Sequence, residues 1–277
     1  MIIDNKIISM KVFILGSNGM LGRYVYKYLS NYYSTIEVNR DKLDVSECIS
    51  LKLETVLKDL DFSKNDIVIN CIGTIKPRVD ELGVTNCIIT NSLFPHILSD
   101  VVNKLGGRVI HPTTDCVYEG EKGNYNEKDP HDVKDVYGRS KSLGENHFST
   151  LIRTSIIGEE LFNKRSLVEW VKSNANGKIN GFTNHYWNGM TCLEFAKLCK
   201  NIIDTQNFWK GVKHIYSNTV SKFELLNIIN EVYDLRIEIT PTVSDSKIDR
   251  TLSSIYPNFY EVVSLRDQIN EMKNFQI

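Results

Sequence analysis

The sequence lacks several features that would assign a chain of 277 residues to a specialised class. Its six cysteines are scattered, with no Cys-x-x-Cys pair and no His/Cys cluster at the spacing of zinc ligands. We therefore expect reduced thiols, no metal centre and a cytoplasmic setting. The cysteines are Cys48, Cys71, Cys87, Cys116, Cys192 and Cys199.

Charge and hydropathy exclude further classes. The formal net charge is -1 at pH 7 without a basic cluster, which argues against nucleic acid or an anionic membrane as the main partner. No apolar run approaches the length of a membrane-spanning helix. Residues 1–10 contain Asp4 and Lys6 and lack the apolar centre of a signal peptide, so we interpret them as a leader. The length allows one large domain or two unequal ones.

A glycine-rich loop is the first positive signal. The buried-strand pattern of residues 11–15 is followed by G-S-N-G-M-L-G (16–22) and then by a helical stretch, 23–29. Strand, glycine loop and helix are the context of a dinucleotide-binding fingerprint, with the helix N-terminus facing the phosphates. In this reading the glycines permit the tight turn, the approach of a pyrophosphate and close helix packing. The predicted cofactor contacts here are Gly16, Asn18, Gly19, Met20 and Leu21.

The following strands refine the cofactor prediction. A strand over 35–39 ends at Arg40, and an arginine there accommodates the 2′-phosphate of NADP, whereas an acid would hold the ribose of NAD. Glu37 is a countersignal, and an ordinary solvated arginine is the alternative. Further cofactor contacts are predicted at Asp44 and Val45 before a helix over 46–60, and at Cys71, Ile72 and Gly73, which end a strand over 66–71.

Strands and helices continue to alternate through the first half. A helical pattern over 85–105 requires a kink or break at Pro95, and a strand over 108–110 follows. This order predicts an α/β fold with a Rossmann-like, doubly wound parallel sheet and right-handed crossovers. We expect an NADP-binding domain over 11–155 and a smaller substrate-binding domain mainly over 156–277, from which segments can return to the sheet. The later elements expected are a strand at 151–154 and helices at 166–172, 190–203 and 221–232.

The strongest chemical signal lies in the stretch 111–145. Tyr137 and Lys141 fall in the first turns of a predicted helix, where their spacing sets phenol and ammonium on one face. A cation beside a phenol lowers its pKa, and such a pair can protonate a developing alkoxide near neutral pH. Tyr118 and Lys122 have the same spacing but lie in a turn-rich loop, where no helix would align them.

The motifs carry a resemblance once they are taken in chain order. The glycine loop, T-T-D-C-V-Y (113–118) and V-Y-G-R-S-K (136–141) together resemble the extended short-chain dehydrogenases/reductases. Within that superfamily the chain resembles the dTDP-4-dehydrorhamnose reductase group, and the likeness extends to D-R-T-L at 249–252. Lys76, the loop 122–130 and the segment 153–158 look closest to a subgroup acting on UDP-linked 2-acetamido-6-deoxy-4-ketohexoses.

The resemblance implies reduction of a sugar 4-keto group by NADPH. Thr114 would donate a hydrogen bond to the ketone oxygen, Tyr137 would protonate it, and Lys141 would lower the tyrosine pKa and hold the nicotinamide ribose. Thr114 also admits the interpretation of a turn hydroxyl bonded to its own backbone. Trp187 would stack on uracil or simply fill the core. The candidate substrate contacts are Lys76, Thr114, Asp115, Arg153, Trp187 and Arg250. The cations that could meet a nucleotide diphosphate are Arg153, Lys164, Arg165, Lys247 and Arg250, although most surface cations have no such role.

Cys116 departs from the simple reductases, which usually carry an aromatic residue there. It resembles the cysteine with which bifunctional epimerase-reductases exchange the proton beside the ketone. A 4-keto group acidifies carbons 3 and 5, so a thiolate can act as base, and His185 is our candidate acid on the opposite sugar face. The alternative is a small cysteine buried at a strand end.

We therefore expect an NADPH-dependent 4-ketoreductase of a nucleotide sugar, UDP-linked rather than dTDP-linked, in a form compatible with a homodimer. Two other functions stay open. The regulatory subunit of methionine adenosyltransferase resembles the same group and acts by binding an enzyme partner. A 4-epimerase or dehydratase on this fold would need tightly held NAD, and Arg40 argues against it.

Overall fold

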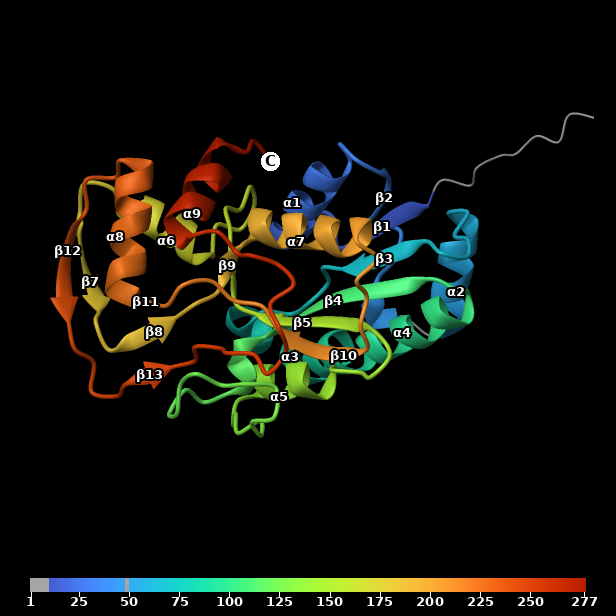
Figure 1. Cartoon of the computed structure of the whole chain (residues 1–277), viewed down its shortest axis with the longest axis horizontal. Coiled ribbons are helices and arrows are strands. Elements are labelled where there is room, and N and C mark those ends of the chain that lie inside the picture. The colour runs from blue at the N-terminus through green and yellow to red at the C-terminus, as the bar shows by residue number, and fades with distance from the viewer. Residues whose placement is uncertain (1–9, 48–49) are drawn as a thin grey trace, which may run out of the picture.

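The computed structural model describes residues 10–47 and 50–277, so nearly all of the predicted leader and Cys48 lie outside the described residues (Figure 1). Its centre is a parallel sheet of six strands in the order β10-β5-β4-β3-β1-β2. The first half of the chain supplies five of these strands, and β10 joins them from the second half. Their bounds are β1 (Lys11–Leu15), β2 (Ser34–Val38), β3 (Ile67–Asn70), β4 (Arg108–Thr114), β5 (Thr150–Thr154) and β10 (Gly211–His214).

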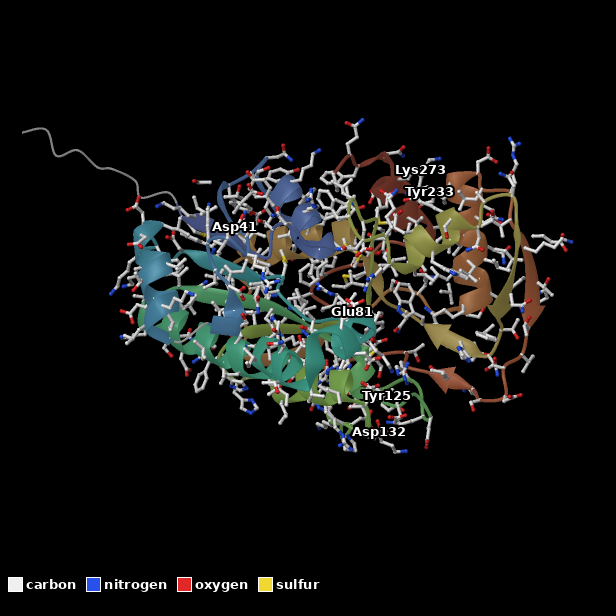
Figure 2. The ribbon with its side chains drawn as sticks, turned by 180° about the vertical axis from the view of Figure 1, so that it is seen from behind. Asp41, Glu81, Tyr125, Asp132, Tyr233 and Lys273 are labelled. Atoms are coloured by element: carbon white, nitrogen blue, oxygen red, sulfur yellow. The ribbon has the colours of Figure 1, made fainter. Side chains whose placement is uncertain are left out.

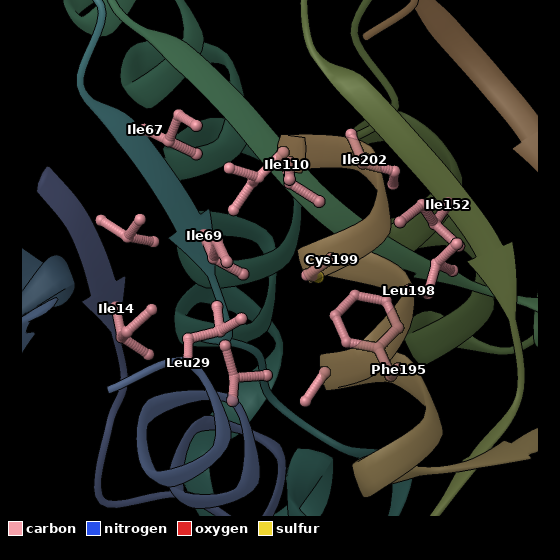
Figure 3. Close-up of a cluster of buried hydrophobic side chains, with 14 of the residues drawn as sticks. Ile14, Leu29, Ile67, Ile69, Ile110, Ile152, Phe195, Leu198, Cys199 and Ile202 are labelled. Carbon is pink, nitrogen blue, oxygen red and sulfur yellow. The ribbon is translucent and has the colours of Figure 1, made fainter. Parts of the chain in front are cut away.

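Helices cover both faces of this sheet because its central strands are apolar on both sides. In β1, Val12 and Ile14 belong to the core beneath α1 (Met20–Leu29) and α7 (Cys192–Asp204), whose side chains Figure 3 shows. The intervening Phe13 and Leu15 pack on the opposite face. There they meet α2 (Ser50–Asp59), which a short 3₁₀ turn (Val45–Glu47) precedes, and α4 (Phe94–Lys104). The predicted α/β architecture is confirmed.

The long helix expected over 85–105 is divided into three parts. The α-helix α3 (Val79–Ile88) passes into a π-helical turn (Ile89–Leu93) and then into α4. Pro95 lies in the first turn of α4, where its missing N–H would have no intrahelical partner in any case. The wider π turn therefore absorbs the break that Pro95 requires.

Strand β4 is longer than the predicted strand over 108–110, since it continues through Pro112 to Thr114. Its pairing with β3 ends at Ile110, whereas its pairing with β5 continues to Thr114. Beyond Ile110 the strand thus has a neighbour on one side only, and proline is tolerated in such an edge position. The extension carries Thr114 to the carboxyl end of the sheet, where parallel α/β folds bind their ligands.

The second half builds a smaller part with its own apolar core, seen beyond the carboxyl ends of the sheet strands in Figure 1. Four of its helices begin with a Ser or Thr whose side chain accepts from the backbone N–H three residues on, where Glu or Asp stands. The remaining elements are α5 (Val136–Leu143), β6 (Ile156–Ile157), α6 (Leu167–Ser173), β7 (Lys178–Phe182), β8 (His185–Trp187), β9 (Met190–Thr191), β11 (Val220–Ser221), α8 (Lys222–Tyr233), β12 (Glu238–Thr242), β13 (Ile248–Asp249), α9 (Leu265–Asn274) and the 3₁₀ turns Lys76–Arg78 and Asp115–Val117.

Two expectations concern what the chain does not build. Within residues 10–47 and 50–277, no helix combines the length and apolarity needed to cross a membrane. The same residues contain no group of three or more His, Cys, Asp or Glu side chains that could hold a metal ion. The five cysteines in the described part of the chain are free thiols.

Candidate active site

Helix α5 presents Tyr137 and Lys141 to a cavity of about 500 Å³ at the carboxyl end of the sheet. Asp135 caps the helix, since its carboxylate accepts from the backbone N–H of Gly138 at 2.9 Å. A side chain at Gly138 would place its Cβ 2.3 Å from the carbonyl oxygen of Cys116, so glycine allows α5 to press against the end of β4. The motif thereby brings Tyr137 to the turn that follows Thr114.

The cavity is of the size that ligand sites usually have, and it gathers most of the predicted site residues. Those that line it are Asn18, Gly19, Met20, Leu21, Cys71, Ile72, Gly73, Lys76, Thr114, Asp115, Cys116, Tyr137 and Lys141. The predicted residues outside its lining are Gly16, Arg40, Asp44, Val45, Arg153, His185, Trp187 and Arg250.

Thr114 takes the local role that was its alternative interpretation. Its hydroxyl oxygen accepts from the backbone N–H of Cys116 at 3.1 Å and so caps the 3₁₀ turn Asp115–Val117. The same hydroxyl donates to the carboxylate of Asp115 at 3.2 Å. These bonds fix the hydroxyl at the cavity wall beside Tyr137, and a stronger acceptor in the cavity can take over its proton.

Burial governs the charge of Tyr137. Removal from water raises the pKa of the phenol above its ordinary value, and the nearby Cys116 adds to the rise. The side chain of Thr114 acts in the opposite direction. The phenol is therefore protonated at neutral pH, which is the state a proton donor needs.

Lys141 is buried and its ammonium donates to the carbonyl oxygen of Pro112 at 3.2 Å. Burial lowers the pKa of Lys141 to about 8, while the carboxylate of Glu145 opposes the shift. The amine remains charged below that pH and lies near Gly73, where a built Cβ would be 4.0 Å from Nζ. Its charge thus lies where the β3 end was predicted to leave room for a dinucleotide.

The glycine loop has the form of a dinucleotide cradle. Gly16 has a φ of +78°, and a Cβ on Gly22 would lie 2.1 Å from the Gly16 carbonyl oxygen, so both positions require glycine. No side chain caps α1 at Gly19, and the buried hydroxyl of Ser17 has no hydrogen-bond partner among the described residues. Unpaired donors at a helix N-terminus suit phosphate. The loop therefore fits a bound dinucleotide.

The predicted contacts after β2 lie outside this cavity. Arg40 is largely exposed and its Nε donates to the carboxylate of Asp44 at 2.9 Å. Hydrogen bonds from Ser46, and then from Arg40, lower the pKa of Asp44 to about 2. Val45 is part of the apolar core. Arg40 can swing toward a 2′-phosphate only by leaving Asp44, an exposed pair that costs little to break.

The structure corrects the prediction that Arg153 meets a substrate phosphate. Arg153 is only 2% exposed and its guanidinium is fully engaged in the interior. It pairs with Glu145 and bonds to the hydroxyl of Tyr118 at 2.7 Å, His214 at 2.8 Å and His131 at 2.7 Å. A buried guanidinium needs such partners, so Arg153 holds β5 to its neighbours.

Two further residues of the predicted site lie outside the cavity lining. Trp187 fills the core of the second half, beneath the ammonium of Lys222 at 5.7 Å, and offers no face to the cavity. His185 bonds to the hydroxyl of Ser244 at 2.7 Å and packs on Phe182, outside the cavity lining. Its role as the acid on the opposite sugar face stays a prediction.

Two predicted cations take intermediate positions. Lys76 lines the cavity and pairs with Asp135 at 2.8 Å, which joins the 3₁₀ turn after β3 to the cap of the Tyr137 helix. Arg250 donates from Nε to the carbonyl oxygen of Tyr118 at 2.7 Å. Its charge reaches Asp115, whose pKa burial raises and Arg250 lowers. Arg250 thus influences the cavity electrostatically, because its charge lowers the pKa of Asp115.

Cys116 lines the cavity, but its surroundings keep the thiol protonated. Burial, followed by the nearby carboxylate of Asp115, raises the pKa of Cys116 to about 12. A general base should be deprotonated near working pH. The raised pKa favours the protonated thiol, although part of the Cys116 side chain stays exposed at the cavity wall.

The fold brings to this site Phe162 and Arg23, which the sequence did not single out, and Arg165, which the sequence offered as one of several cations for a nucleotide diphosphate. Asn91 lies in the π turn and bonds to both backbone groups of Thr74, at 2.8 and 2.9 Å. Phe162 and Arg165 line the cavity from the segment between β6 and α6, and Arg23 lines it from α1. The signal for the break in the helix around Asn91 was Pro95, which cannot continue a regular helix.

These features define a Rossmann-type dinucleotide-binding protein with a Tyr/Lys pair at its cavity. The chain belongs to the family described as the RmlD substrate binding domain, whose model matches residues 10–247. Its curated relatives include a dTDP-4-dehydrorhamnose reductase of Burkholderia thailandensis, 28% identical over 49% of this chain and 44% of the relative. They also include methionine adenosyltransferase 2 subunit beta of Xenopus laevis, 29% identical over 51% and 43%.

Solved structures extend the likeness to the whole fold. The dTDP-4-dehydrorhamnose reductase of Bacillus anthracis in complex with NADP superposes with a TM-score of 0.79 at 18% identity, covering 96% of this chain and 99% of that one. The chain spans about half the length of the curated relatives that it matches. Family and fold are thus established, and activity is a matter for the chemistry of the site.

Proposed function

We propose that this chain reduces the 4-keto group of a nucleotide-activated 6-deoxyhexose with NADPH. The observation that carries the proposal is that Thr114, Tyr137 and Lys141 meet the glycine loop in one cavity. The family and the reductase relatives agree with it. NADPH is preferred to NADH because Arg40, after β2, is the residue type that accommodates a 2′-phosphate. The glycine loop and Lys141 would hold this cofactor.

The proposed reaction uses each residue in the state described above. When bound, the reduced nicotinamide supplies hydride to carbon 4. Thr114 turns its hydroxyl from Asp115 to the ketone oxygen and stabilises the charge that develops there. Tyr137 gives its proton to this oxygen, and the ammonium of Lys141 stabilises the phenolate that remains. The phenol then regains a proton from solvent.

We further propose that the substrate is a UDP-linked 2-acetamido-2,6-dideoxy-hexos-4-ulose. This choice rests on the likeness of Lys76, the loop 122–130 and the segment 153–158 to a subgroup with that substrate. Exchange of the proton at carbon 3 by Cys116 is the optional second activity. The raised pKa of its thiol favours a plain reductase.

A coupled assay in heavy water tests these statements together. NADPH is supplied with the 4-keto-6-deoxy product of a UDP-N-acetylglucosamine 4,6-dehydratase, and the product is analysed by proton NMR. We expect NADPH oxidation without deuterium at carbon 3. Deuterium at that position, abolished in Cys116→Ser, would show epimerisation. No oxidation with either the UDP-linked or the dTDP-linked ketosugar would refute the reductase proposal.

A second function has its own supporting observation. The match to methionine adenosyltransferase 2 subunit beta is as high in identity as the match to the reductases. A binding subunit would retain a stoichiometric enzyme partner in a pull-down and turn over no ketosugar. The homodimer that we also propose would be measured by light scattering on the purified chain.

A further inference from the structure

Residues 159–166, which we call the strap, leave β6 and cross to α6 along the cavity. Glu160, Leu161, Phe162, Asn163 and Arg165 all line it. Asn163 and Lys164 have φ values of 64° and 46°, so the strap turns through two successive left-handed residues. Phe162 is 64% exposed although it is aromatic. An exposed aromatic ring at a cavity edge is available to cover a ligand.

The strap touches both walls of the cavity. On one wall, the guanidinium of Arg23 stacks on the Phe162 ring, 4.8 Å from its centroid. Arg23 directly follows the glycine loop, and its Nε donates to the Asn18 carbonyl oxygen at 3.1 Å. On the other wall, Arg165 forms an ion pair with Glu81 of α3, which Figure 2 places near the middle of the molecule. The strap therefore spans the cofactor helix and α3.

Charge around the strap is unbalanced. Glu81 serves two guanidinium groups, because Arg78 Nε lies 3.7 Å from the same carboxylate. Glu160 is committed to the strap itself, accepting from the backbone N–H of Arg165 at 2.5 Å and of Ser166 at 3.0 Å. The described cations that line the cavity are Arg23, Lys76, Arg78, Lys141 and Arg165, against the acids Asp115 and Glu160. Asp135 and Glu81, outside that lining, pair with Lys76, Arg78 and Arg165 and offset part of this charge. The balance that remains is positive and suits an anionic ligand.

We propose that Arg165 is a diphosphate-binding residue that rests on Glu81 until a nucleotide enters the cavity. Arg165 and Glu81 are 45% and 47% exposed, and an ion pair so exposed contributes little. A diphosphate offers the guanidinium charge-assisted, bidentate hydrogen bonds that are stronger. Arg78, whose Nε lies 3.7 Å from the same carboxylate, then remains as the partner of Glu81. Phe162, held on Arg23, keeps the strap over the ligand.

The ligand class is a nucleoside diphosphate, which either the cofactor or the nucleotide sugar can supply. The inference deepens the proposed function. It rests on that function in one respect, which is that the cavity binds a nucleotide. It does not require that a ketone be reduced. Binding measured without turnover therefore separates the two proposals.

A double-mutant cycle on the full chain tests the inference. Arg165→Gln, Glu81→Gln and the double variant are titrated by calorimetry with UDP and, separately, with NADP⁺. For one ligand, Arg165→Gln should weaken binding about tenfold or more, the usual scale for a charged hydrogen bond. Glu81→Gln should tighten the same ligand a few-fold by freeing Arg165, in line with the modest strength of exposed pairs. The double variant should bind no better than Arg165→Gln.

A matched control is available in α8 and α9. Glu231 and Arg266 form an exposed pair of the same kind outside the cavity lining, so Glu231→Gln should change neither affinity. Loss in the UDP arm assigns Arg165 to the nucleotide sugar, and loss in the NADP⁺ arm assigns it to the cofactor. Unchanged affinity for both ligands in Arg165→Gln would overturn the inference. An equal gain from Glu81→Gln with and without Arg165 would also overturn it, because that gain would come from the field alone.

Discussion

The chain contains the sequence Tyr-x-x-x-Lys twice, within 20 residues of each other, and the structure treats the two copies differently. Tyr137 and Lys141 share a face of α5 and line the cavity. Tyr118 and Lys122 lie in the loop after β4, which has no helix to align them. The comparison shows that the spacing acquires chemical meaning only from the backbone that carries it.

The loop copy has a structural task instead. Tyr118 is fully buried, stacks on Tyr125 at 4.1 Å and accepts from Arg153 at 2.7 Å. Lys122 points outward to Asp129 at 2.5 Å. One phenol thus satisfies a buried guanidinium, whereas the other faces a ligand cavity beside Thr114. A reactive tyrosine is the one whose hydroxyl the fold leaves available.

The largest expected difference between the copies is in turnover. Tyr137→Phe should lower kcat/KM by about 10²–10⁴-fold because the proton donor is lost. Tyr118→Phe should retain turnover and lower the free energy of unfolding by about 1–3 kcal/mol, since a buried Arg153 N–H loses its acceptor. Steady-state kinetics and urea denaturation of both variants measure the two effects. A loss of turnover in Tyr118→Phe with turnover retained in Tyr137→Phe would contradict the role assigned to Tyr137.

The lysines should differ in the same direction. Lys141→Gln should reduce kcat/KM by about 10²-fold, because the phenolate left on Tyr137 loses its neighbouring charge. Lys122→Gln removes an exposed pair, so unfolding free energy should change by less than about 1 kcal/mol and kinetics not at all. A comparable kinetic loss in both variants would contradict the distinction drawn here.

Protonation of His214, in the network around Tyr118, should lower the free energy of unfolding. Burial, and then the charge of Arg153, lowers the pKa of His214 from its ordinary 6.5 to about 4. Between these values the unfolded chain binds the proton and the folded chain does not, so stability falls as pH drops from about 6.5 to about 4. The loss attributable to His214 is up to about 3 kcal/mol. His214→Gln should flatten this part of the curve in urea melts; an unchanged slope would exclude His214 as its source.

The smallest effect is a change in the pH profile of reduction. Because the pKa of Lys141 lies at about 8, its ammonium is lost as pH rises through that value. The rate should therefore decline above about pH 8, by up to tenfold per unit. Lys122→Gln should leave the profile unaltered, as an exposed lysine outside the cavity. A flat profile to pH 10 would remove the charge of Lys141 from the mechanism.

Local sequence patterns predicted much of the first half. The strand Lys11–Leu15 appears with the predicted bounds, and the glycine loop precedes α1 as expected. These predictions succeed because alternation of side chains and the steric freedom of glycine act over a few residues. The helix over 85–105 was only partly right, since no local rule distinguishes a kink at Pro95 from a π turn ahead of it.

Long-range predictions for single side chains fared less well. Arg153, His185 and Trp187 have the right chemistry for substrate contacts, yet they serve a buried network, a strand surface and a core. The contacts of a cation or an aromatic ring depend on the neighbours that the fold places beside it. Phe162 was missed for the converse reason, because the strap becomes part of the site only by crossing the cavity. Arg165 was offered only as one of several cations, and no local pattern distinguished it from Lys164 or Lys247.

The sequence by itself determined the α/β alternation, the dinucleotide loop and the helix that aligns Tyr137 with Lys141, because each depends on backbone preferences within about ten residues. Tertiary structure alone decided which tyrosine is available, which groups surround the Cys116 thiol and shift its pKa, and that Arg165 faces the cavity. Those outcomes depend on burial and on partners brought from distant segments, and the free energy of a charge or a proton is set by such surroundings.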